Sequence, residues 1–332
     1  MMTAAELQAK ISVLNAYQIE QVAVQVSKYL KLNDELKDTI PTVCPCCSET
    51  EAKFIKKGFQ SGKQRYQCKC CGRKFTYDTG CLTSCSHQPP DAWNTVIEDT
   101  LNWISLDKTA VKISVCHETA FNMRHKLLAF LEKIADSFDS LGELVEMDET
   151  YVLESSKGRK VDGRKPRKHG AKASKRGLSA EQFCVCVAAD RSKHMAARCV
   201  NRAKPSAADV ENALGSYIQP ESVILCDGSN SYDRLAADKR CEKIVLSEYE
   251  MYNRLYHLNT VNGLHSQIKT MLDRYRGVAS KYLNRYLALF TVSVNFGKPS
   301  LEESVDNIRN TLKSVRCYIT YMKSQSLNLL TL

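Results

Sequence analysis

The sequence predicts an α/β fold in the second half of the chain, preceded by a small cysteine-rich part and a helical part. Three observations carry this prediction. Strand-like segments alternate with amphipathic helical segments after residue 141. Two C-x2-C pairs lie near the N-terminus, and a helix-turn-helix pattern follows them. The expected organisation is a helical element at 1–40, a cysteine-rich ribbon at 41–80, a helix-turn-helix domain at 88–140, an α/β domain at 141–297 and a helical tail at 298–332.

The amino-acid composition limits the classes of protein to which the chain can belong. The 332 residues are 43% hydrophobic, which permits a buried core, and no apolar run approaches the ~20 residues that a membrane span needs. The N-terminus lacks the basic-then-apolar layout of a signal peptide, so we expect a cytoplasmic protein without a membrane partner. The net charge of +10 suggests a polyanionic partner, although solubilising charge alone would give the same total.

The two cysteine pairs predict a zinc ribbon. "CPCC" at 44–47 and "CKCCG" at 68–72 give C-x2-C twice, separated by 20 residues. Zinc takes four soft ligands in a tetrahedron, and two tight turns supply them. Between the pairs we expect a hairpin around Ser61-Gly62, and after them a third strand. Cys46 and Cys70 leave a shifted ligand choice open, and the basic ribbon could be structural or contact DNA. The expected zinc ligands are Cys44, Cys47, Cys68 and Cys71.

Residues 106–135 have the pattern of a helix-turn-helix. A short helix at 106–112, a turn at 113–115 and a longer helix from about His117 fit the motif. A helical linker domain would give a similar pattern, but a ribbon before it favours DNA binding. Ala120, Met123, Leu127 and Leu131 are expected to face inward. Glu118, Asn122, Arg124 and Lys126 are expected to face outward, within reach of DNA.

The second half reads as strand, strand, strand, helix, strand, helix, strand, helix, which suits a ribonuclease H-like core. The expected strands are 144–152, 182–190, 194–200, 222–232 and 241–247, and the expected helices are 205–218 and 259–275. In such a core the first and fourth strands lie side by side, so Asp148 and Asp227 should share one space. Two carboxylates there would repel unless divalent cations such as Mg2+ bind between them.

The late helix is expected to complete this site. At ~100° per residue its apolar residues fall on one face, which should pack on the sheet. Its polar face would then be free to look toward the acids, although a solvated face is the alternative. The polar face comprises Asn262, His265, Ser266, Lys269 and Asp273.

These motifs resemble a known family. "EMDETYV", "VILCDGSNSY" and "HLNTVNGLHSQIKTMLDRYRGVASKYLNRY" are similar to bacterial insertion-sequence transposases of the fifteen-ninety-five group (ISXO2-like), which carry a zinc ribbon before a ribonuclease H-like domain. "RYQCKCCGRKFT" and "TAFNMRHKLL" match in the same order, so the resemblance covers about residues 41–295. It implies Asp148, Asp227 and Asn262 as ligands of Mg2+ or Mn2+, with Lys269 beside them. The third position is Glu in many relatives and Asn, followed by this Lys, in a subgroup.

Asparagine at this position has a chemical consequence. It offers a neutral carbonyl oxygen where glutamate would offer a charged bidentate carboxylate, so a second ion should be held more weakly. Lys269, two turns along the same helix face, could contact a phosphate. The sequence leaves open whether Glu146, Glu149 or Asp233 supplies the missing charge.

A basic segment interrupts the first two expected strands. Residues 157–176 contain ten lysines and arginines and one aspartate. Such a run is normally solvated. Its place beside the acids favours binding to the DNA backbone, because phosphate neutralisation supplies most sequence-independent affinity. The residues expected to bind DNA are Arg164, Lys165, Arg167 and Lys168.

The resulting prediction is a DNA transposase that binds the ends of its insertion sequence and cuts and joins strands with metal ions. The resemblance implies double-stranded DNA as partner and a homodimer or larger homo-oligomer, in a bacterial cell with the protein held on the nucleoid through DNA. Two alternatives stay open: a structure-specific nuclease on the same core, and an inactive DNA-binding regulator.

Overall fold

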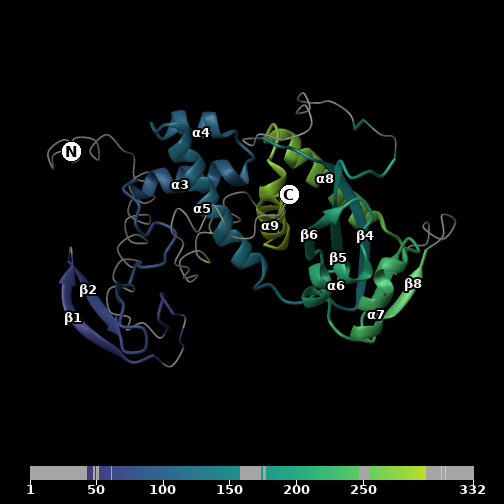
Figure 1. Ribbon diagram of the computed structural model, residues 1–332, viewed down its shortest axis with the longest axis horizontal. Coiled ribbons are helices and arrows are strands. Elements are labelled where there is room, and N and C mark those ends of the chain that lie inside the picture. The colour runs from purple at the N-terminus through teal and green to yellow at the C-terminus, as the bar shows by residue number, and fades with distance from the viewer. Residues whose placement is uncertain are drawn as a thin grey trace, which may run out of the picture. The chain divides into compact units, whose positions relative to one another are not determined.

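The computed structural model describes residues 43–47, 49, 52–60, 62–157, 173–174, 177–246 and 255–296, together with residues 308 and 311. The chain divides into two compact units, Met1–Gly80 and Cys81–Leu332 (Figure 1). The expected helical element at 1–40 lies outside the described residues, as does nearly all of the expected tail at 298–332. No helix in the described part of the chain is long and apolar enough to cross a membrane.

The first unit is a three-stranded antiparallel sheet in the order β1-β2-β3. Its strands are β1 (Phe54–Gln60), β2 (Lys63–Cys68) and β3 (Lys74–Thr76). The hairpin and the third strand therefore lie where the turn signal at Ser61-Gly62 and the "RKFTY" run predict them. Phe75 packs against Tyr66, and Phe54 lies edge-on to it with ring centroids 5.4 Å apart. This aromatic cluster is small, so most of the sheet faces water.

Three helices open the second unit: α3 (Pro90–Leu101), α4 (Leu106–Lys112) and α5 (His117–Ala135). Pro90 stands at the first position of α3, where its missing N–H costs nothing. α4, the turn and α5 have the bounds that the sequence pattern predicts. The four residues expected to face inward from α5 are all buried: Ala120, Met123, Leu127 and Leu131.

A five-stranded mixed sheet follows, in the order β6-β5-β4-β7-β8. β4 is antiparallel to β5 and parallel to β7, β5 is antiparallel to β6, and β7 is parallel to β8. These are the order and directions of a ribonuclease H-like core, which confirms the predicted fold. The strands are β4 (Leu144–Leu153), β5 (Gln182–Asp190), β6 (Met195–Arg202), β7 (Val223–Cys226) and β8 (Glu242–Val245). The helices are α6 (Ala207–Leu214), α7 (Asp233–Lys239), α8 (Asn259–Arg274) and α9 (Leu283–Asn295).

Helices cover both faces of this sheet (Figure 1). Along β5, Phe183, Val185 and Val187 join the core beneath α8 and α9, whereas Cys184 and Cys186 join the core beneath α6 and α7. Alternate residues of a strand point to opposite faces, so a nearly continuous apolar run is what a strand buried on both sides requires.

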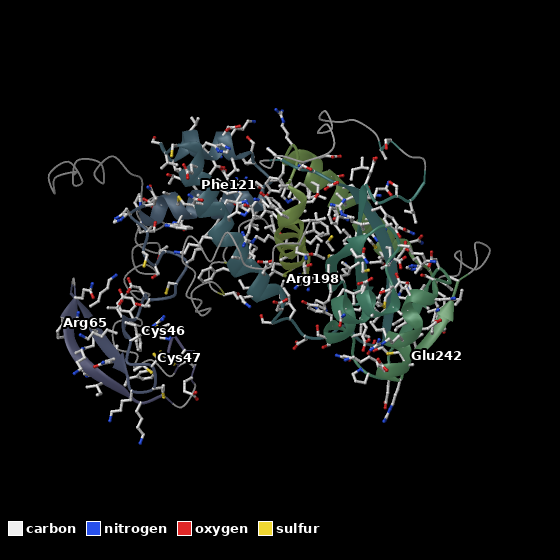
Figure 2. All side chains as sticks on the ribbon, in the orientation of Figure 1. Cys46, Cys47, Arg65, Phe121, Arg198 and Glu242 are labelled. Carbon is white, nitrogen blue, oxygen red and sulfur yellow. The ribbon has the colours of Figure 1, made fainter. Side chains whose placement is uncertain are left out.

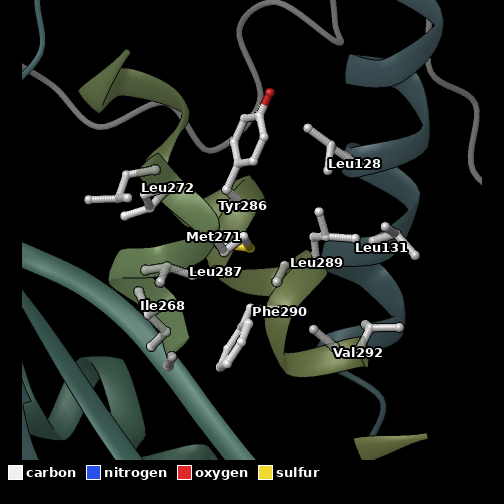
Figure 3. Packing of buried hydrophobic residues seen from close by; sticks show 14 of the residues in the cluster. Leu128, Leu131, Ile268, Met271, Leu272, Tyr286, Leu287, Leu289, Phe290 and Val292 are labelled. Carbon is white, nitrogen blue, oxygen red and sulfur yellow. The ribbon is translucent and has the colours of Figure 1, made fainter. Parts of the chain in front are cut away.

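α5 shares the first of these cores with α8 and α9. Figure 3 shows Leu128 and Leu131 of α5 converging with Met271 of α8 and Leu289 of α9. A buried polar contact lies beside this cluster: the Arg285 Nε of α9 is 3.5 Å from Glu132 Oε2 of α5. The helix-turn-helix and the sheet therefore belong to one packed unit.

Candidate active site

The acids of β4 lie on two faces of the sheet. Leu144 and Val152 pack toward α8 and α9, so Glu146 and Asp148 share that face. Val145, Met147 and Tyr151 pack toward α6 and α7, so Glu149 lies on the opposite face. The "LVEMDETYV" stretch thus presents its three acids in two directions.

The end of β7 brings Asp227 between the acids of β4. β7 pairs with β4 only through Leu144–Glu146, so the next residues of β4 run past the last residue of β7. Asp227 follows at once, and Gly228 turns the chain with φ +92°, where a Cβ would lie 3.1 Å from Val245. Carboxylate oxygens of Asp148, Glu149 and Asp227 all lie within 4.8 Å of one another. The predicted meeting of the first and fourth strands is present in the structure.

These three carboxylates are held by hydrogen bonds to neighbouring backbone and hydroxyl groups. Within the described part of the chain, no lysine or arginine forms an ion pair with any of them. Asp148 Oδ1 accepts a hydrogen bond of 2.8 Å from the Glu149 N–H, Asp227 Oδ1 accepts one of 3.2 Å from the Ser229 N–H, and Glu149 Oε1 accepts one of 3.0 Å from Ser231. Burial raises the pKa of Asp148 to about 6, and the charges of Asp227 and Glu149 add to the rise. Such a set has the composition of a hard-cation site.

α8 lies across β4 with its predicted polar face toward Asp148. His265 Nδ1 is 3.8 Å from Asp148 Oδ2. Asn262 precedes His265 by one turn and is exposed, and Lys269 follows it by one turn and is also exposed. His265 is only 7% exposed, because it is covered where α8 meets the sheet. Burial lowers the pKa of His265 to about 4, with the Lys269 charge adding to the shift.

Glu146 fixes the beginning of α8. Its side chain is 1% exposed and accepts hydrogen bonds from the guanidinium of Arg191 and, at 3.0 Å, from the Val261 N–H. His257 Nδ1 lies 3.2 Å from the same carboxylate. Arg191, in the turn between β5 and β6, also donates to the Leu255 carbonyl at 3.0 Å. This buried network joins β4, the β5–β6 turn and the first turn of α8, which carries Asn262.

The predicted zinc ligands converge in the first unit. The four sulfurs lie within 4.8 Å of one another, with Cys44 Sγ 3.8 Å from Cys71 Sγ and Cys47 Sγ 3.9 Å from Cys68 Sγ. A tetrahedron with Zn–S bonds of about 2.3 Å has S–S edges of about 3.8 Å, so the four thiols fit zinc. Gly72 closes the second knuckle with φ +69°. Figure 2 shows Cys46 beside Cys47 in the first knuckle. The four ligands expected are those that converge: Cys44, Cys47, Cys68 and Cys71.

The helix-turn-helix residues predicted to reach DNA need correction. Arg124 is 1% exposed, because α5 is enclosed on both sides; its guanidinium donates to Thr109 of α4 at 3.0 Å and lies 5.5 Å from the ring centroid of Tyr275. Lys126 is half-buried, over the Trp93 ring, and donates to the Ser84 carbonyl at 2.5 Å. Asn122 is half-buried as well. An outward face for Arg124 is therefore wrong in this conformation.

Two further points concern the basic segment at 157–176 and Arg191. Most of the basic segment at 157–176 lies outside the described residues, and so do its predicted DNA contacts, Arg164, Lys165, Arg167 and Lys168. The sequence reasoning missed Arg191 as a site residue, although its place in the turn directly after a buried strand could have drawn attention to it. The sequence carries no local signal that pairs it with Glu146, 45 positions earlier.

Comparison with known proteins gives consistent matches. Residues 140–294 match the family model of the ISXO2-like transposase domain. The chain is 30% identical over 265 residues to the "Uncharacterized protein in transposable element ISH50" of Halobacterium salinarum, which covers 78% of this chain and 87% of that protein. The family match runs from the start of β4 into α9, the elements that hold the acidic residues and α8.

Among solved structures, the chain is similar to the catalytic core domain of BIV integrase, with 16% identity, 51% of this chain and 97% of that chain covered, and a TM-score of 0.32. It is also similar to the Mos1 strand transfer complex, with 14% identity, 74% of this chain and 80% of that chain covered, and a TM-score of 0.30. A third similar structure is the mariner Mos1 paired end complex with Mg, with 15% identity, 70% and 81% coverage, and a TM-score of 0.25.

Proposed function

The chain belongs to the ISXO2-like transposase family, and from this premise we propose that it cuts and joins DNA strands at the ends of its insertion sequence by metal-dependent phosphoryl transfer. One observation carries the proposal: the Asp148 and Asp227 carboxylates lie within 4.8 Å of each other, and neither forms an ion pair with a lysine or arginine among the described residues. An inactive DNA-binding regulator would have no need to keep such a repulsive pair.

The residues fit a divalent cation. Buried acids elsewhere in the unit are paired, as Glu154 is with Arg202 and Asp99 is with Lys112. Asp148 and Asp227 instead face each other, which is unfavourable unless a cation compensates their charge. Carboxylate oxygens are the ligands that Mg2+ and Mn2+ prefer. When bound, such an ion activates the attacking hydroxyl and stabilises charge on the phosphate oxygens.

α8 supplies the neutral and cationic groups of the proposed site. Asn262 offers a carbonyl oxygen as a further ligand, without adding charge. Lys269 is two turns further along the same face, and its exposed ammonium is suited to a DNA phosphate. The Glu146–Arg191 network holds the first turn of α8 against β4, so these groups stay in register with Asp148.

The other parts of the chain are proposed to bind DNA. The ribbon carries basic residues around its zinc ligands, and the exposed start of α5 includes His117. The basic segment at 157–176 would add contacts to the DNA backbone on the grounds of its composition. Joining two element ends calls for at least two active sites, which supports a homodimer or larger assembly. Deleting 157–176 should flatten the salt dependence of DNA binding, and an unchanged slope would rule out that contact.

A strand-transfer assay tests the proposed function. The wild-type chain, incubated with Mg2+ and its own flanking DNA, is expected to nick the element ends and join them to a target. Asp148→Asn should reduce cleavage on the order of 1000-fold, since it removes one charged ligand. Glu143→Gln, which neutralises an exposed acid just before β4, is the matched control and should retain activity. Cleavage without joining would identify a nuclease, and full activity of Asp148→Asn would refute the site.

A further inference from the structure

The proposed cation site has one negative charge fewer than a site built from two aspartates and a glutamate. Asp148 and Asp227 contribute two carboxylates, and Asn262 contributes a neutral amide. Three acids near the site could make up the difference: Glu146, Glu149 and Asp233. Their partners in the structure separate them.

Two of the three are already neutralised. Glu146 is paired with Arg191 and caps α8 through the Val261 N–H. Asp233 forms an ion pair with Lys243, with Nζ and Oδ1 2.5 Å apart. An acid whose charge is compensated by a base contributes little to a cation site. Glu149 forms no such pair with the described lysines and arginines, and its carboxylate lies within 4.8 Å of both Asp148 and Asp227.

The fold explains how Glu149 reaches the site from the far face of the sheet. β4 pairs with β7 only as far as Glu146, so beyond that residue a side chain on either face can reach around the unpaired edge. Ser231, in the loop that follows Asp227, donates to Glu149 Oε1 at 3.0 Å and holds the carboxylate at that edge. Asp148 approaches from the α8 face and Glu149 from the α7 face, with Asp227 between them.

We propose that Glu149 is the third carboxylate ligand of the catalytic cation site and replaces the charge that Asn262 does not provide. The inference rests on the proposed function, since it concerns the same cations. The three acids then give the site a charge of −3, as an aspartate-aspartate-glutamate set would, but with two of the acids adjacent on one strand.

A second observation at the site also points to a ligand. His265 is 7% exposed, its Nδ1 faces Asp148 Oδ2 at 3.8 Å, and its Nε2 is buried without a hydrogen-bond partner among the described residues. A buried nitrogen without a hydrogen-bond partner destabilises the fold unless a ligand or an ordered water satisfies it. Three carboxylates without a lysine or arginine partner among the described residues therefore lie beside a buried imidazole nitrogen without a hydrogen bond, as expected where a hydrated cation belongs.

Manganese affinity of the full-length, zinc-loaded chain tests the inference without relying on activity. Mn2+ titrations followed by electron paramagnetic resonance give the Kd for wild type and for Glu149→Gln, which keeps the shape of the side chain and an acceptor for Ser231. The expected result is a rise in Kd of about tenfold or more, because one charged ligand is lost. Glu143→Gln removes an equal charge from a nearby exposed position and should leave Kd within about twofold.

Further variants separate the possible causes of a change. Ser231→Ala removes the hydrogen bond but keeps the carboxylate, and should change Kd far less than Glu149→Gln; an equal loss would show that Glu149 only orders the loop, which overturns the inference. Asn262→Glu in the Glu149→Gln background returns one negative charge to the site and should recover Mn2+ affinity.

Comparison with Asp148→Asn separates failure of the inference from failure of the proposed function. If Asp148→Asn weakens Mn2+ binding and Glu149→Gln does not, the inference fails and the proposed function stands. If neither variant weakens binding, both fail.

Discussion

The ion pair between Glu146 and Arg191 gives a quantitative prediction for stability. Arg191→Met removes the guanidinium and leaves the Glu146 carboxylate, 1% exposed, with the Val261 N–H and His257 as its remaining contacts. Breaking a buried ion pair costs about 3–5 kcal/mol, because an uncompensated charge stays buried. The Arg191 side chain is 29% exposed, so water can partly replace it, and we expect a loss of about 3 kcal/mol.

The double variant tests the reason for this loss. Glu146→Gln together with Arg191→Met leaves no buried charge, and the glutamine carbonyl can still accept from the Val261 N–H. We therefore expect the double variant to be more stable than Arg191→Met alone, by about 1–2 kcal/mol. Additive losses from the two substitutions would contradict the pairing, because residues in direct contact should be coupled.

Urea-induced unfolding followed by tryptophan fluorescence measures both variants. Both tryptophans of the chain, Trp93 and Trp103, lie in the second unit, so the signal reports on the unit that contains the ion pair. A loss below about 1 kcal/mol for Arg191→Met, the range of an exposed salt bridge, would refute the argument that Glu146 depends on it.

Three further predictions concern metal, pH and packing. Chelation of zinc, or Cys44→Ser, should unfold the first unit and leave the second unit's unfolding transition unchanged. The reason is that, besides the cysteine ligands, the described core of the sheet has only three buried apolar residues, Ala52, Tyr66 and Phe75; retained amide protection in β1 and β2 would contradict this. Burial and the neighbouring Arg285 lower the pKa of His125 to about 3, so the folded state holds it neutral and stability is lost as pH falls below its unfolded pKa of about 6.5. At pH 5 this amounts to about 2 kcal/mol relative to pH 7, and His125→Asn should remove that part of the pH dependence. Leu287→Ala, at a fully buried position beside Ile268 and Met271 of α8 (Figure 3), should cost about 3 kcal/mol in urea unfolding, and a cost below about 1 kcal/mol would mean that the site is loosely packed.

Local patterns in the sequence predicted most of the elements and two clusters of side chains, although β7 (Val223–Cys226) and α6 (Ala207–Leu214) are shorter than the expected strand at 222–232 and helix at 205–218. The cysteine spacing predicts the four thiols that converge in the first unit, because two tight knuckles place their own ligands. The strand order of a ribonuclease H-like core predicts that Asp148 and Asp227 meet, because Asp148 lies on one strand and Asp227 directly follows the end of its parallel neighbour. The bounds of α4 and α5 follow from apolar periodicity in the same way.

The tertiary structure decided which polar groups are paired and which are left for a ligand. Periodicity assigns Arg124 to a solvated face, but α5 is enclosed by α4 on one side and by α8 and α9 on the other, so Arg124 is buried. Likewise Glu146 and Glu149 look alike in the sequence, yet one has its base 45 residues away across the sheet and the other has none among the described residues. The physical reason is that helix and strand periods encode contacts only with near neighbours, whereas the electrostatic state of an acid depends on charges brought to it by chain segments far away in the sequence.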